Sequence, residues 1–194
     1  VATLAERPAG RQIVTTRVVA PSDRAFVVRT IERALAADAG RGRVFVVVPR
    51  IDEEEGVGTG IDAADQWLGE AFGREKIVTV HGRLSADVQR EGIDAFRRGT
   101  HPILLGTTVV EVGLDVPDAN LMVILGAEHF GVAQLHQLRG RVGRGGQKAG
   151  CLLVPESEVD GARAPPSALA SGPTAPGSRR DRRAAPRAPS PRAP

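Results

Sequence analysis

Short runs of apolar residues alternate along this chain with segments in which apolar residues recur every three or four positions. The short runs predict β-strands, and the periodic segments predict α-helices. Strands are expected at residues 12–19, 43–49, 77–80, 102–107, 120–125 and 150–154. Helices are expected at residues 22–38, 61–72, 85–99 and about 131–139.

Residues at the ends of these segments support the predicted helices. Ser22 or Asp23 precedes the first helix, and either side chain can accept a hydrogen bond from the free amides of a first helical turn. Gly40 and Gly73 follow the first and second helices, where glycine commonly ends a helix. Gly92 falls inside the third helix and is expected to weaken it, because an interior glycine costs about 1 kcal/mol relative to alanine.

The order of these segments predicts an α/β fold. The run 43–49, "RVFVVVP", is apolar without alternation, which is typical of a strand buried on both faces. Repeated β-α-β units with such strands predict a parallel sheet that is covered by helices on both faces. Ligands of these folds bind at the carboxyl ends of the strands, so the loops after residues 49, 80, 107 and 125 are the candidate sites.

The composition changes after residue 154 and predicts two regions. Residues 155–194 contain most of the 14 prolines of the chain and all of its net charge of +3, since residues 1–155 hold equal numbers of acidic and basic side chains. We expect a folded domain over residues 7–154 and a disordered tail over residues 155–194, as a solvated segment or a nucleic-acid-binding arm. The overall basic charge is therefore no argument that the domain binds DNA.

Cysteine usage and hydropathy predict a cytoplasmic protein. Cys151 is the single cysteine, which excludes a framework of internal disulfides and fits a reducing compartment. No uncharged apolar run approaches the roughly 18 residues of a membrane span, and the first residues lack the pattern of a signal peptide.

The loop after strand 77–80 contains the first candidate site. His81, Gly82 and Arg83 combine a small residue with a cation, and such a loop can approach a phosphate closely. The alternative is a plain surface turn before a helix capped by Ser85.

The loop after strand 102–107, "TTVVEVGLDVP", is the second candidate. Thr107 and Thr108 supply hydroxyls that suit phosphate oxygens, and Asp115 supplies a carboxylate that suits a sugar hydroxyl or a cation. Gly113 permits an unusual backbone conformation between them. The alternative is a half-buried helix and turn that the threonines simply cap.

The stretch 134–146, "QLHQLRGRVGRGG", is the third candidate. Arg141 and Arg144 are three residues apart, so they would face the same side of a final helical turn. The glycines between them would let that turn approach a ligand, and two guanidinium groups suit a polyphosphate. The alternative is a glycine-rich exit loop with solvated arginines.

Several other site types are excluded or disfavoured by the sequence. The acids 52–55 follow strand 43–49 only after Pro49, Arg50 and Ile51, which places them too far along the loop to act as the Mg²⁺ ligands of a Walker B strand. The 194 residues contain no G-x-x-x-x-G-K-[ST] phosphate loop, and they show no metal-ligand cluster or nucleophile motif.

Taken together, these segments resemble motifs of superfamily 2 helicases. The stretch "TTVVEVGLDVP" is similar to motif V, and "QLHQLRGRVGR" is similar to motif VI, Q-x-x-G-R-x-G-R. With "HGRL" and the N-terminal "RPAGRQIVTTRVV", residues 7–154 resemble the second RecA-like motor domain of the RecG family of ATP-dependent DNA helicases. The transcription-repair coupling factor shares "AQLHQLRGRVGR" and is the alternative family.

The resemblance implies a RecA-like fold and a division of roles between residues. ATP lies between two such motor domains, and the second domain contributes arginines to it. The implied nucleotide contacts are the γ-phosphate ligands Arg141 and Arg144, with Gln137 positioning their turn, and Gly113 and Asp115. The implied contacts with the DNA backbone are His81, Gly82, Arg83, Thr107 and Thr108.

The resemblance also implies partners. These are branched or forked DNA, remodelled in recombination and repair, and the family's first motor domain and wedge domain, which the 194 residues do not match. The first motor domain of the family holds Mg²⁺ and the phosphate loop, so we expect this chain alone to be inactive toward ATP. A hypothesis of a different class is a RecA-like domain that binds DNA or protein without catalysis.

Overall fold

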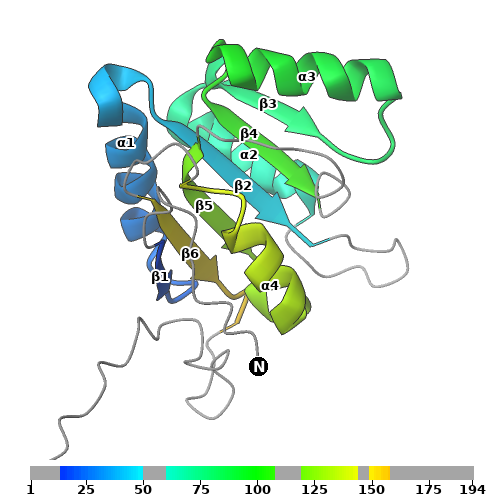
Figure 1. Ribbon diagram of the computed structural model, residues 1–194. Helices are drawn as coiled ribbons and strands as arrows, with labels where there is room; N and C mark the ends of the chain where they lie inside the picture. Colours follow the sequence, from blue (N-terminus) through cyan, green and yellow to red (C-terminus); the bar gives the residue numbers. More distant parts are fainter. Residues whose placement is uncertain (1–13, 50–59, 108–118, 144–148, 158–194) are drawn as a thin grey trace, which may run out of the picture.

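A six-stranded parallel sheet forms the centre of the protein (Figure 1). The computed structural model describes residues 14–49, 60–107, 119–143 and 149–157. The strands are β1 (Thr15–Val18), β2 (Arg43–Val48), β3 (Ile77–Val80), β4 (Ile103–Thr107), β5 (Ala119–Leu125) and β6 (Gly150–Val154). They lie in the order β1-β6-β5-β2-β4-β3, and each neighbouring pair is parallel.

The helices lie where the apolar periodicity predicts them. They are α1 (Arg24–Gly40), α2 (Ile61–Phe72), α3 (Ala86–Arg98) and α4 (Val132–Arg139), with short 3₁₀ turns η1 (Arg74–Lys76) and η3 (Ala127–His129). Of the two predicted caps for α1, Asp23 is the one used, because its Oδ1 accepts a hydrogen bond from the Phe26 amide at 3.1 Å. Ser85 caps α3 in the same way, accepting from the Val88 amide at 3.4 Å.

Helices cover both faces of the sheet, as the sequence predicts. Val27 and Ile31 of α1 share a buried cluster with Leu68 of α2. Phe96 of α3 and Leu138 of α4 belong to a second buried cluster. Alternate residues of the central strand β2 enter the two clusters, so this strand is buried on both sides.

Gly92 has a packing role that helix propensity does not reveal. The helix α3 continues through it, and a Cβ at this position would lie 3.0 Å from Val80 Cγ2 and 3.1 Å from Val78 Cγ2. Glycine therefore lets α3 lie close to the edge strand β3, which offsets the propensity cost expected from the sequence.

Asp65 fixes α2 against the same edge of the sheet. Its carboxylate is paired with Arg74 and accepts a hydrogen bond from Thr79 Oγ1 at 2.6 Å. Because α2 also contributes Trp67, this contact helps to set where that indole lies relative to the carboxyl ends of the strands.

Candidate functional site

The loop after β3 presents His81, Gly82 and Arg83 at the carboxyl edge of the sheet. The Arg83 amide donates to His81 Nδ1 at 3.3 Å, and the Leu84 amide donates to the His81 carbonyl oxygen at 3.1 Å. These two bonds close a tight turn in which His81 is half-buried while Gly82 and Arg83 are exposed. The turn is therefore fixed internally and faces solvent.

Thr107 lies beside this turn because β4 pairs with β3. Val80 is opposite Gly106 in that pairing, so the loops that begin with His81 and Thr107 start from neighbouring strands, whose spacing is about 4.8 Å. The fold thus brings these two candidate DNA contacts to one corner of the sheet. Thr108, Gly113 and Asp115, like the acids 52–55, lie outside the described residues.

The turn after α4, residues 140–143, contains Arg141 and does not continue the helix. The helix ends at Arg139, so Arg141 lies beyond it, and Gly143 adopts a φ of 75°, a left-handed conformation. The expectation that Arg141 lies on a final helical turn is therefore wrong. Arg144 itself lies outside the described residues.

The turn 140–143 also lies away from the carboxyl edge. The Gly143 amide donates to the carbonyl oxygen of Ala119 at 3.2 Å, and Ala119 is the first residue of β5. The turn is therefore attached at the amino end of that strand, roughly 20 Å from its carboxyl end at a rise of about 3.3 Å per residue. Gln137, one helical turn before Arg141, is on the exposed side of α4.

Cys151 of β6 is buried in the same cluster as α4 and is not suited to nucleophilic chemistry. It is buried in the cluster that includes Leu138. Burial raises the pKa of its thiol from 9.0 to about 12, and the positive charge of Arg139 opposes that rise. The thiol is therefore protonated at neutral pH, and the residue is a packing element.

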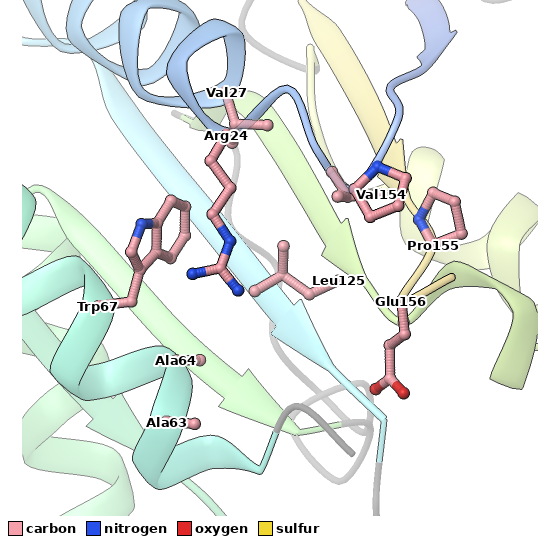
Figure 2. A pocket seen from close by; sticks show the side chains of 11 residues that line it. Arg24, Val27, Ala63, Ala64, Trp67, Leu125, Val154, Pro155 and Glu156 are labelled. Atoms are coloured by element: carbon pink, nitrogen blue, oxygen red, sulfur yellow. The ribbon is translucent and has the colours of Figure 1, made fainter. Parts of the chain in front are cut away.

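A cavity of about 430 Å³ opens where the first turns of α1 and α2 meet the carboxyl ends of β5 and β6. Its apolar walls include Val27, Leu125 and Val154, and it also has one cationic and one anionic side chain, Arg24 and Glu156. Figure 2 shows Arg24 extending from α1 toward the space between Trp67 and Leu125, with Glu156 at the other end. No local sequence motif marks this cavity, because its lining comes from four separate segments.

The described residues contain neither a group of metal ligands nor a helix that could cross a membrane. Within residues 14–49, 60–107, 119–143 and 149–157, no three His, Cys, Asp or Glu side chains are grouped as metal ligands. In the same part of the chain, no helix is long and apolar enough to cross a membrane.

Comparison with known proteins gives a consistent family. Residues 27–146 match the model of the helicase conserved C-terminal domain. The chain is 44% identical over 151 residues to the ATP-dependent DNA helicase RecG of Thermotoga maritima, covering 77% of this chain and 19% of the relative. It is 40% identical over 162 residues to RecG of Mycobacterium tuberculosis, covering 78% of this chain and 22% of the relative.

Solved structures agree with these relatives. A structure of RecG bound to a three-way DNA junction matches with a TM-score of 0.63 and 40% identity, covering 77% of this chain and 19% of that one. The second domain of a DEAD-box helicase bound to an RNA duplex matches with a TM-score of 0.58 and 16% identity, which supports the fold alone. The predicted RecA-like fold is confirmed, and the chain spans about a fifth of the length of the RecG proteins that it matches.

Proposed function

This chain belongs to the family of helicase conserved C-terminal domains, and we propose that it is the second motor domain of a RecG-like ATP-dependent DNA helicase that remodels branched DNA in recombination and repair. Its similarity to RecG at 40–44% identity supports this function, and the transcription-repair coupling factor is the alternative. The first motor domain and a wedge domain would be its partners within the helicase.

The observation that carries the proposal is that the two groups of candidate residues lie at opposite ends of the sheet. His81 and Thr107 begin loops at the carboxyl edge, whereas the turn 140–143 is attached to the amino end of β5 through Gly143 and Ala119. A motor must couple two ligands through one rigid body, and this arrangement gives each ligand its own surface. DNA would lie on the carboxyl edge and the phosphates of ATP against the arginines.

The residues present fit one half of an ATP site. Arg141 would meet the γ-phosphate together with Arg144, with Gln137 positioning their turn, while Gly113 and Asp115 would contact the nucleotide. Guanidinium groups stabilise charge that develops during phosphoryl transfer. The chain contains no phosphate loop, and its described residues contain no group of metal ligands, so ATP and Mg²⁺ would be held by the first motor domain.

Arg141→Ala in a protein with both motor domains tests the proposal. Turnover of ATP is expected to fall by at least about 10²-fold, or roughly 2.7 kcal/mol of barrier. Fork affinity is expected to stay within about two-fold, because the DNA-contacting residues His81, Gly82, Arg83, Thr107 and Thr108 would be intact. Arg141→Lys should restore little, since a lysine cannot reproduce the planar fork of arginine.

Arg90→Ala is the matched control for this experiment. Arg90 is an exposed arginine of α3 that pairs with Asp87 at 3.4 Å and belongs to neither proposed set of contacts, so its loss should change neither quantity. If Arg141→Ala lowered turnover and fork affinity together, the arginine would be a DNA ligand. If it lowered neither, the domain would be a non-catalytic platform and the motor assignment would be withdrawn.

A further inference from the structure

We propose that the cavity between α1 and α2 is a slot for one unpaired base of a DNA single strand, held between Trp67 and Arg24. This inference rests on the proposed function, and it adds a base-binding site to a domain whose other candidate DNA contacts are to the backbone. The site is built from side chains of α1, α2 and the ends of β5 and β6.

The first argument is the spacing between the guanidinium and the indole. Arg24 Cζ lies 6.0 Å from the centroid of the Trp67 ring. A second cation over a ring, Arg17 above Phe26, is in direct contact at 4.3 Å. The Arg24 pair is therefore open, while the Arg17 pair is closed.

The distance from Arg24 Cζ to the Trp67 ring centroid is about 1 Å shorter than a flat ring between them needs. Stacked bases are separated by about 3.4 Å, so a base between the indole and the guanidinium would require roughly 7 Å between them. Arg24 is the first residue of α1 and is exposed, so its long side chain can move by about 1 Å without disturbing the core. Bases commonly stack on aromatic rings and on guanidinium planes.

The second argument is the chemistry of the remaining walls. Val27, Leu125 and Val154 are buried and apolar, which suits the aromatic ring of a base and disfavours a charged phosphate. At the far end, the side chain of Glu156 lines the cavity, and its carboxylate lies 3.5 Å from His129 Nε2. The backbone amide of Glu156 donates to Glu128 Oε1 at 2.9 Å, so two carboxylates lie there. Their negative charge repels phosphate. A nucleotide would therefore enter with its base inward and its phosphate on the Arg24 side.

The third argument is the position of the cavity on the sheet. It opens at the carboxyl ends of β5 and β6, and the corner with His81 and Thr107 lies on the same edge. In the strand order, β5 is three positions from β3, which corresponds to roughly 14 Å. About four stacked nucleotides cover that distance, so one short single strand can reach both places.

The test uses the fluorescence of the chain itself. Trp67 is the one tryptophan and there is no tyrosine, so intrinsic emission reports on this slot alone. An oligodeoxycytidylate of about 12 bases, a length within the range of single-strand binding sites, is expected to quench that emission saturably. Affinity is measured in parallel by the anisotropy of the labelled oligonucleotide.

Substitutions in the slot give the expected magnitudes. Trp67→Ala should weaken binding by roughly 5- to 150-fold, the range for losing one stacked base, whereas Trp67→Phe should retain most of it. Arg24→Ala should weaken binding several-fold. Arg17→Ala is the matched control, because it removes a nearby cation from a closed pair, and it should change affinity by no more than about two-fold. The thermal midpoint of each variant shows that it is folded.

The outcomes separate this inference from the proposed function. In one outcome, the oligonucleotide binds and a His81→Ala/Arg83→Ala double variant weakens that binding, but Trp67 emission is not quenched and the substitutions at Trp67 and Arg24 have no effect. This outcome overturns the base slot and leaves the DNA-binding proposal intact. Failure of the oligonucleotide to bind at all overturns both. Equal quenching by ATP at the same concentration of bases assigns the slot to free nucleotides and overturns the inference. Quenching by a leucine-containing dipeptide, without any response to the oligonucleotide, would assign it to protein side chains.

Discussion

Replacing Gly143 by alanine tests whether the shape of the turn 140–143 matters for the proposed motor function. Gly143 has a φ of 75°, and its amide donates to Ala119 at 3.2 Å. A residue with a Cβ is expected to lose about 1–2 kcal/mol in this left-handed conformation. If the turn instead gives way and relieves this strain, the hydrogen bond to β5 is lost, which costs about 0.5–1.5 kcal/mol.

The expected loss in the free energy of unfolding is therefore about 1–2 kcal/mol if the turn keeps its shape, and about 0.5–1.5 kcal/mol if it gives way. For a domain of this size, 1 kcal/mol lowers the thermal midpoint by roughly 3–6 °C. Denaturant titration of the chain measures the change directly. In a protein with both motor domains, Gly143→Ala should also lower ATP turnover, because it moves the backbone next to Arg141.

Gly40→Ala is the control that separates strain from function. Gly40 is the last residue of α1 and has a φ of 82°, and a Cβ there would meet nothing within 4 Å. It therefore introduces the same backbone strain outside the turn 140–143, and it should lower stability by a similar amount of about 1–2 kcal/mol without changing ATP turnover. Gly143→Ala that is as stable as the unchanged chain would refute the conformational argument. Gly143→Ala that loses stability but keeps full turnover would refute the link to function.

Three further predictions concern the same chain. Because the pKa of Cys151 is raised to about 12, alkylation of the folded protein should be at least about 10³-fold slower than that of the unfolded chain near neutral pH. The unfolded thiol ionises near pH 9 and the folded one does not, so the free energy of unfolding should fall as pH rises from 9 toward 12. A Cys151→Ala variant should lose that part of the pH dependence. Gly92→Ala should change the free energy of unfolding by less than about 1 kcal/mol, because a gain in helix propensity opposes crowding against Val78 and Val80. Gly92→Leu should lower it by about 1–3 kcal/mol. Equal effects of the two substitutions would show that α3 does not approach β3 closely. Removing residues 158–194 should leave the thermal midpoint unchanged and reduce only salt-sensitive DNA binding, and a large drop in the midpoint would show that this segment packs on the domain.

The elements and their order could be predicted from local patterns in the sequence. Apolar runs such as that of β2 have the composition of buried strands. Single residues next to a helix mark its ends, as Ser85 does before α3 and Gly73 after α2. Motif VI could also be recognised from the sequence, because its glycines and arginines lie within one short stretch of the chain. These features depend on neighbours in the chain, so no long-range pairing is needed to recognise them.

The tertiary structure decided what those elements bring together. The strand order places β5 next to β2. The hydrogen bond from Gly143 to Ala119 then holds the turn with Arg141 at the amino end of β5, whereas the sequence predicts ligand-binding loops at the carboxyl ends of the strands. The pairing of β3 with β4 unites the His81 and Thr107 loops, and the packing of α1 and α2 on β5 and β6 forms the cavity beside Trp67. Hydrophobic period specifies which face of an element is buried, but it does not specify which partner buries it. That choice depends on contacts between residues far apart in the chain, so it emerged only when the whole sheet was assembled.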